Sequence, residues 1–341
     1  MLLKRPHASS PAPRAIARWL LIVAAMVFLM VVVGGITRLT ESGLSMTRWE
    51  PVSGTIPPLT DKAWAAEFAS YQATPEYQKI NRGMDLAGFK RIFFWEYLHR
   101  LIARTIGIVF ALPLLWFWWR RNIPSGYGGR LVGLLALGGL QGVIGWWMVA
   151  SGLIDRPDVS HLRLATHLLM ALFIFACTIW TALDLRGSGR PARLGLRSLA
   201  LILVLAVQIM LGAFTAGLDA GYAYASWPKM GDSWFPEGGW HQGWSLLANA
   251  VDNPVVVQFI HRWFAWIAAA AVVTMAVRAS RRRAKGAAHA LATIVAVQIA
   301  LGIATLLTGV DIVIAVAHQA VAALLLATMV YAAHRIGRGA R

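Results

Sequence analysis

Charged residues are scarce in this chain, and acidic residues are the scarcest of them. Only 14% of its 341 residues are charged, and 15 acidic residues face 32 basic ones. Soluble domains carry about 25% charged residues. Because 58% of the residues are hydrophobic, the composition excludes an ordinary soluble domain and predicts an integral membrane protein.

Cysteine is almost absent as well. The single cysteine, Cys177, lies within an apolar stretch. One thiol cannot form an intramolecular disulfide, and it cannot build a cysteine-based metal cluster. Both kinds of chemistry are therefore excluded within one chain.

Long apolar runs are what the chain has instead. A transmembrane helix needs about 20 apolar residues. Eight runs approach that length, at 17–36, 92–119, 131–150, 162–184, 195–216, 255–279, 287–309 and 311–334. The first run lacks a small-residue cleavage pattern, so we expect it to be retained rather than removed as a signal peptide. We predict an all-α integral membrane protein with eight transmembrane helices.

Basic residues alternate between the loops. They gather in the N-terminal tail (1–16), around 120–130, 186–197 and 278–285, and at the C-terminal end, whereas the other loops carry most of the acidic residues. The positive-inside rule places both termini in the cytoplasm. Because the net charge of +17 is spread over separate loops, the expected partner of these residues is the lipid membrane, and we expect no nucleic acid partner.

The chain contains an internal repeat. The stretch GGITRLTESG (34–43) aligns with GAFTAGLDAG (212–221), and WEYLHR (95–100) aligns with VQFIHR (257–262). Each half has an even number of spans, so both have the same orientation and form a parallel repeat. We predict two four-helix bundles, 17–190 and 191–341. Each has a long outer loop, and the first loop is expected to hold a short amphipathic helix around DKAWAAEFASYQ.

Four histidines lie near the outer ends of the even-numbered spans: His99, His167, His261 and His318. Each half supplies two, which is the number that ligates one heme iron from both faces. One such histidine alone is more often an interfacial or hydrogen-bonded residue, but four at matched depth favour heme ligation. Small residues at Gly107, Gly142, Gly145, Gly212 and Gly302 provide room for a macrocycle or allow ordinary close helix packing. Arg100 and Arg262 follow two of the histidines and are candidates to pair with heme propionates or to anchor their helices.

The two halves differ beside the histidines. Glu96 lies three residues before His99, on the same face of the helix, whereas the corresponding residue before His261 is Gln258. A buried carboxylate in one half only indicates an enzyme with one catalytic and one auxiliary site. The alternative is a structural partner for Arg100 or Arg104.

Several long stretches carry a family resemblance: GGITRLTESGLSMTRWEPVSGTIPPLT (34–60), EFASYQATPEYQKIN (67–81), MDLAGFKRIFFWEYLHR (84–100), AGLDAGYAYASWPKM (216–230) and NPVVVQFIHR (253–262). They closely resemble the heme A synthase family, in the subclass found in mitochondria and alphaproteobacteria, from about residue 17 to 335. The resemblance implies an inner-membrane oxidoreductase acting on CH or CH2 groups. It converts heme O to heme A for cytochrome oxidase by oxidising the C8 methyl to a formyl, through two hydroxylations and loss of water.

The resemblance also implies roles for individual residues. His99 and His167 match the pair that surrounds the substrate heme O, and Glu96 matches the acidic residue proposed for catalysis. His261 and His318 match the pair that ligates a heme b cofactor. Implied partners are heme O synthase, an unidentified electron donor and a possible second copy of the chain. The cysteine pair found in the other subclass is missing here.

Two other classes of function remain open. A di-heme b-type electron-transfer cytochrome needs the four histidines but not Glu96. A permease is suggested by the parallel repeat, but it needs a polar pathway, and the inner halves of the spans are too apolar to favour one. One chemical question also remains: if His99 and His167 both bind iron, no coordination position is open for dioxygen.

Overall fold

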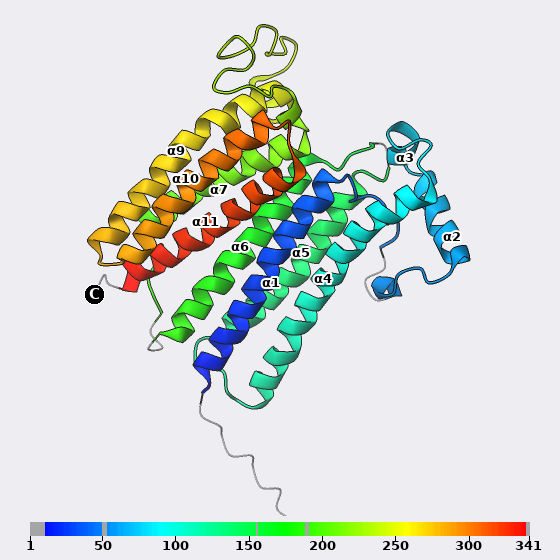
Figure 1. Cartoon of the computed structure of the whole chain (residues 1–341). Helices are drawn as coiled ribbons and strands as arrows, with labels where there is room; N and C mark the ends of the chain where they lie inside the picture. The colour runs from blue at the N-terminus through cyan, green and yellow to red at the C-terminus, as the bar shows by residue number, and fades with distance from the viewer. Residues whose placement is uncertain (1–10, 50–52, 155, 188–190, 339–341) are drawn as a thin grey trace, which may run out of the picture.

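The computed structural model describes residues 11–49, 53–154, 156–187 and 191–338. Within these ranges the chain is helical, and eight of its helices are long and apolar enough to cross a membrane. They are α1 (Pro13–Leu39), α4 (Leu86–Trp119), α5 (Gly128–Ala150), α6 (His161–Arg186), α7 (Leu196–Gly217), α9 (Pro254–Arg281), α10 (Lys285–Leu307) and α11 (Ile312–Arg338) (Figure 1). The eight predicted spans are confirmed, each with ends shifted by a few residues.

Shorter helices lie in the segments that connect the spans. They are η1 (Ser53–Thr55), α2 (Asp61–Gln72), α3 (Pro75–Lys79), η2 (Ala220–Tyr222) and α8 (Leu246–Asp252). The expected helix around DKAWAAEFASYQ is confirmed as α2. It begins where the Thr60 hydroxyl accepts a hydrogen bond from the Ala63 amide, which satisfies one of the free donors of the first turn.

α4 is much longer than a bilayer requires. A helix of 34 residues is about 50 Å long, against about 30 Å for the hydrocarbon core. Its first turns therefore extend beyond the membrane, where Phe89 and Phe93 form a cluster with Tyr71 of α2. Asp85 caps this extension by accepting a hydrogen bond from the Gly88 amide. The extension fixes α2 and α3 beside the end of the bundle (Figure 1).

Helices in the two halves of the chain have corresponding packing partners. α1 contacts α4 and α6, and α5 contacts the same two helices; α7 contacts α9 and α11, and α10 contacts the same two helices. Between the halves, α6 contacts α7, α1 contacts α11, and α6 contacts α11. The parallel-repeat interpretation stays a prediction, and so does the boundary between 190 and 191, because residue 190 lies outside the described residues.

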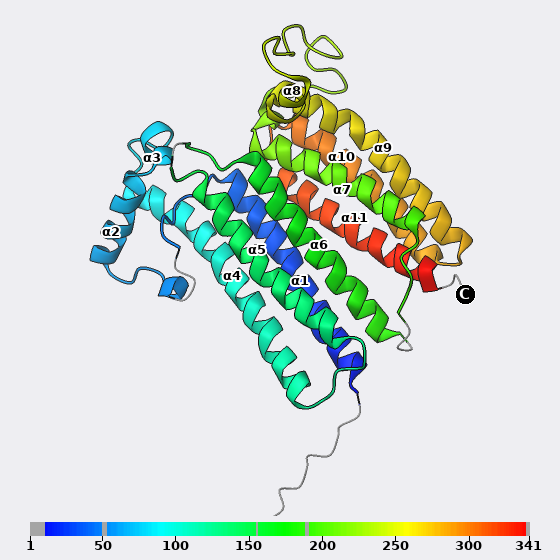
Figure 2. The same cartoon turned by 180° about the vertical axis from the view of Figure 1, so that it is seen from behind.

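The two ends of the bundle differ. The start of α1 and the end of α11 lie at one end, called the terminal end, and the long segments after α1 and α7 lie at the other, called the loop end (Figures 1 and 2). Residues 1–10 of the predicted cytoplasmic tail and residues 339–341 lie outside the described part. Which end faces the cytoplasm stays a prediction.

A buried ionic cluster joins the halves at the terminal end. Asp184 of α6 accepts hydrogen bonds from Arg130 of α5 at 2.9 Å, from His334 of α11 at 2.9 Å and from the Ala192 amide at 2.8 Å. Asp184 and His334 are each only 1% exposed. A buried carboxylate is tolerated when it is paired and hydrogen-bonded in this way. We call these four residues the Asp184 cluster.

Candidate functional site

The four predicted histidines come from four different spans. His99 lies on α4, His167 on α6, His261 on α9 and His318 on α11. His167 lies close enough to His99 to act on it electrostatically, and His318 lies equally within reach of His261. The fold thus brings the histidines together as the two pairs that the sequence suggested. In the described ranges no three His, Cys, Asp or Glu side chains form a metal-binding group.

Each histidine ring lies against a glycine of a neighbouring helix. A Cβ atom at Gly34, Gly145, Gly212 or Gly302 would lie 3.1, 2.9, 3.1 or 2.8 Å from Cε1 of His99, His167, His261 or His318 respectively. Such distances are below normal carbon contact, so a larger residue at any of these positions would displace the ring. Three of these glycines were candidates in the sequence and Gly34 was not; Gly107 and Gly142 have nothing within 4 Å of an added Cβ.

Three of the histidines contact a glutamine amide. The distance from Gln Nε2 to His Nδ1 is 3.1 Å for Gln141 and His167, 3.1 Å for Gln208 and His261, and 3.2 Å for Gln298 and His318. Nε2 of Gln141 and of Gln208 also donates to the backbone carbonyl of the same histidine, at 3.0 and 3.1 Å. Each of these two amides therefore holds both the ring and the backbone of its histidine. Paired imidazoles in glycine cradles fit a bis-histidine heme.

Glu96 is buried, only 3% exposed, and fully engaged in hydrogen bonds. One carboxylate oxygen accepts from Arg100 at 2.6 Å, and the other accepts from the Ser45 hydroxyl and the Met46 amide, both at 2.7 Å. The structural pairing with Arg100 therefore exists. It fixes the carboxylate one turn before His99 and attaches the segment that follows α1 to α4.

Gln258, the corresponding residue of the other half, also attaches a loop segment to its helix, but it donates hydrogen bonds instead of accepting them. Gln258 donates from Nε2 to the Tyr224 carbonyl at 3.1 Å and to the Gly221 carbonyl at 3.4 Å. Glu96 accepts, whereas Gln258 donates. The two halves thus hold their loop-end segments alike, and only the first half places a carboxylate there, a group that can take up a proton.

The two candidate arginines contact the segments at the loop end. Arg100 donates to the carbonyls of Met46 and Arg48, each at 3.0 Å. Arg262 donates to the carbonyls of Ser226 at 2.9 Å and Lys229 at 3.0 Å. These contacts fix the segments over the histidine pairs. Pairing of either guanidinium with a propionate stays a prediction.

A buried acid that sequence reasoning missed lies in α3. Glu76 is 4% exposed, and its Oε2 atom has no hydrogen-bond partner among the described residues. Burial is the largest cause that raises the pKa of Glu76, the charges of Glu96, Glu41 and Asp158 raise it too, and the resulting pKa is about 8. Only a hydrogen bond from Tyr71 lowers this pKa. Glu76 therefore keeps its proton to a higher pH than an ordinary glutamate does.

The packing of α3 should depend on pH through Glu76. The pKa is about 8 in the fold, against an ordinary value of 4.5, so the folded state binds this proton more tightly than the opened segment does. The free energy that holds α3 closed should fall as pH rises from about 4.5 to about 8 and then level off. Hydrogen exchange of the α2 and α3 amides, divided by the intrinsic exchange rate at each pH, should accelerate over that interval. The Glu76→Gln variant should lose this additional dependence on pH; an unchanged dependence would refute the assignment.

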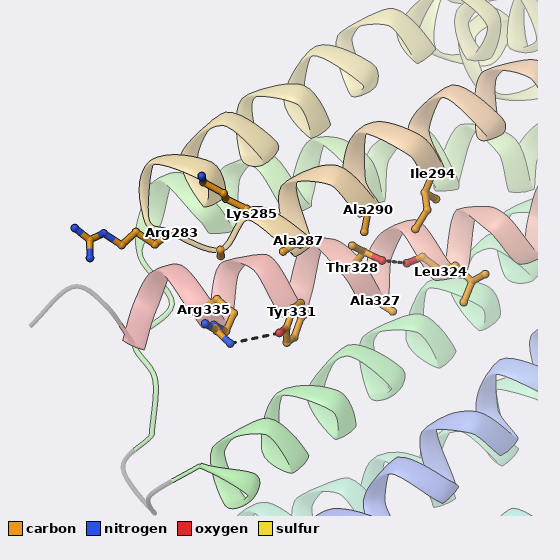
Figure 3. A pocket seen from close by; sticks show the side chains of 12 residues that line it. Arg283, Lys285, Ala287, Ala290, Ile294, Leu324, Ala327, Thr328, Tyr331 and Arg335 are labelled. Carbon is orange, nitrogen blue, oxygen red and sulfur yellow. Dashed lines mark hydrogen bonds between the residues drawn. The ribbon is translucent and has the colours of Figure 1, made fainter.

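A groove at the terminal end is separate from the histidine pairs. It lies between α10 and α11, has a volume of about 480 Å³, and combines the basic residues Arg283, Lys285 and Arg335 with apolar residues such as Ile294. Figure 3 shows Arg335 beside the Tyr331 hydroxyl, at 3.5 Å. None of the predicted site residues lines this groove.

Comparison with known proteins agrees with this architecture. The COX15-CtaA family, described as cytochrome oxidase assembly protein, matches residues 17–330. A heme A synthase of Rhizorhabdus wittichii is 60% identical, covering 99% of this chain and 98% of that protein. Heme A synthases of Sphingopyxis alaskensis and Novosphingobium aromaticivorans are 53% and 49% identical, covering 98% and 96% of this chain and 96% and 99% of their own lengths.

Proposed function

The chain belongs to the COX15-CtaA family of cytochrome oxidase assembly proteins, and on that premise we propose that it is a heme A synthase. The family that the motifs indicated is confirmed. The observation that carries the proposal is the similarity to heme A synthases over nearly the whole length of both proteins. The proposed reaction oxidises the C8 methyl of heme O to a formyl, by two hydroxylations followed by loss of water from the gem-diol.

The two histidine pairs take different roles in this proposal. His99 and His167 flank the substrate heme O, and His261 and His318 hold heme b. The contacts of the histidine rings with glycines and glutamines support the proposal that both pairs bind heme. When bound, the hemes supply the redox chemistry of the reaction. The chain itself orients the imidazoles, keeps the substrate between α4 and α6, and closes each site with an outer segment.

Glu96 is the proposed proton acceptor. All of its hydrogen-bond partners donate to it, which holds the carboxylate in one orientation. A carboxylate one turn before His99 can take the proton from one hydroxyl of the gem-diol and pass it to the other hydroxyl, which leaves as water as the C–O bond breaks. Arg100 and Ser45 keep the carboxylate in position. Gln258 offers no such group, which supports an auxiliary role for the second site.

Location and partners are part of the same proposal. The protein is a multi-pass membrane protein, and we place it in the bacterial inner membrane with both termini cytoplasmic and the histidines toward the outer side. Heme O synthase is the proposed source of substrate. An electron donor, not identified by the fold, and a possible homo-oligomer complete the expected partners.

One observation favours a second candidate, a di-heme electron-transfer cytochrome. Glu96 and Gln258 both attach an outer segment to a helix, so a purely structural role for Glu96 explains its contacts too. In that case the protein binds heme in both halves without modifying it.

Analysis of extracted hemes separates the two functions. Cells that express this chain with a supply of heme O should contain heme A or a hydroxylated heme, identified by chromatography with mass detection. The purified protein, given heme O and a chemical reductant in air, should form the same products. If both preparations hold only heme b and unconverted heme O, the cytochrome function replaces the synthase.

A further inference from the structure

Three of the four histidine contacts share a pattern in the sequence. A glutamine lies one helical turn before the glycine that cradles the ring: Gln141 before Gly145, Gln208 before Gly212, and Gln298 before Gly302. Residues four apart lie on the same helix face. The glycine therefore makes room for the ring, and the glutamine holds it.

The fourth contact lacks the glutamine. Gly34 cradles His99, but the residue four positions before it is Met30. The offset that aligns Gly34 with Gly212 also aligns Met30 with Gln208. A thioether is only a weak acceptor. In agreement, Nδ1 of His99 is buried without a hydrogen-bond partner within the described ranges, unlike Nδ1 of His167, His261 and His318.

A hydrogen bond at Nδ1 has a known effect on a metal-binding imidazole. It restrains the orientation of the ring. A histidine without that bond rotates more easily. His99 is thus the least restrained of the four imidazoles, and it is the one beside Glu96.

We propose that Met30 makes His99 a releasable heme ligand, whereas Gln141, Gln208 and Gln298 hold the other three histidines as fixed ligands. Release of His99 opens one face of the N-terminal heme to a small exogenous ligand on the side of Glu96. The C-terminal heme stays closed on both faces. This inference rests on the proposed function only in taking the N-terminal pair as a heme site.

A reciprocal exchange of Met30 and Gln208 tests the proposal without enzyme turnover. The probe is carbon monoxide, added to the purified, dithionite-reduced protein and followed by absorbance. Wild-type heme b in the C-terminal site should not bind carbon monoxide. In Gln208→Met, His261 loses its amide, and the fraction of C-terminal heme b that binds carbon monoxide should rise at least severalfold.

The converse variant addresses the first site. In Met30→Gln loaded with heme O, carbon monoxide binding at the N-terminal heme should fall severalfold relative to wild type, and the oxidised heme should shift toward a low-spin electron paramagnetic resonance signal. Gln319→Met is a matched control, because Gln319 adjoins His318 but donates to the Val31 carbonyl. It should leave carbon monoxide binding unchanged.

Clear results would overturn the proposal. It fails if Gln208→Met retains heme b and still excludes carbon monoxide, or if Met30→Gln binds carbon monoxide as well as wild type does. If Gln208→Met loses its heme, the Met30→Gln result decides alone. The C-terminal measurement needs neither heme O nor heme A. If the wild-type protein makes no heme A but the C-terminal heme b of Gln208→Met binds carbon monoxide, the synthase function is refuted and this inference is retained.

Discussion

The Glu96→Ala variant should form no detectable heme A while it retains heme b. A positioned acid or base contributes about 10²–10⁴-fold to a rate, so product formation should fall by at least about a hundredfold. Heme b should remain because Glu96 lies in the half of the chain that does not hold it. The measurement is the ratio of heme A to heme b extracted from the purified variant and from wild type.

A structural role for Glu96 needs its own control. Gln258→Ala removes the corresponding attachment in the other half and should leave substantial heme A formation. Ser45→Ala removes one hydrogen bond to Glu96 but keeps the carboxylate, and it should reduce the rate only moderately. Wild-type heme A from Glu96→Ala would eliminate the catalytic role. Equal losses in Ser45→Ala and Glu96→Ala would show that the attachment of the outer segment is what matters.

Replacement of His261 or His318 by alanine should remove the low-spin heme b spectrum almost completely. Both imidazoles are needed for a six-coordinate iron, and in this fold they come from two different helices, α9 and α11. The measurement is the reduced-minus-oxidised spectrum of the purified protein, normalised to protein content. His99→Ala is the matched variant: it should retain the heme b spectrum and lose heme A. An unchanged spectrum in His261→Ala or His318→Ala would refute the ligand pair.

Helices of this protein were predictable because a bilayer imposes a length and a composition on each span. The eight spans follow from that constraint, and α2 was expected instead from the amphipathic stretch DKAWAAEFASYQ. The start of α4 was not predictable, because Leu86–Arg91 lie beyond the apolar run and are helical through the Asp85 cap and the contacts of Phe89. Hydropathy reports where a helix crosses the membrane, and it does not report where the helix begins.

The candidate site was only partly predictable. Sequence offsets paired the histidines, since each repeat carries its own two. The partners of those histidines come from other helices, and which residue faces a ring depends on how two helices are rotated against each other. Gln208 and His261 are 53 residues apart, and no local pattern marks the first as a partner of the second. Glu76 was not predicted for a related reason, because its burial comes from packing between α3 and the extension of α4.

The Asp184 cluster has a consequence for how the protein is made. Membrane proteins are inserted progressively during synthesis, and Asp184 enters the bilayer with α6, whereas His334 follows 150 residues later. Until α11 has been translated, the carboxylate lacks one of its partners, and the contact between α6 and α11 cannot form. Gly337 of α11 is buried, and a Cβ atom there would collide with the Arg193 backbone. The packing of α6, a helix of the first half, is therefore completed only when a helix of the second half has been inserted.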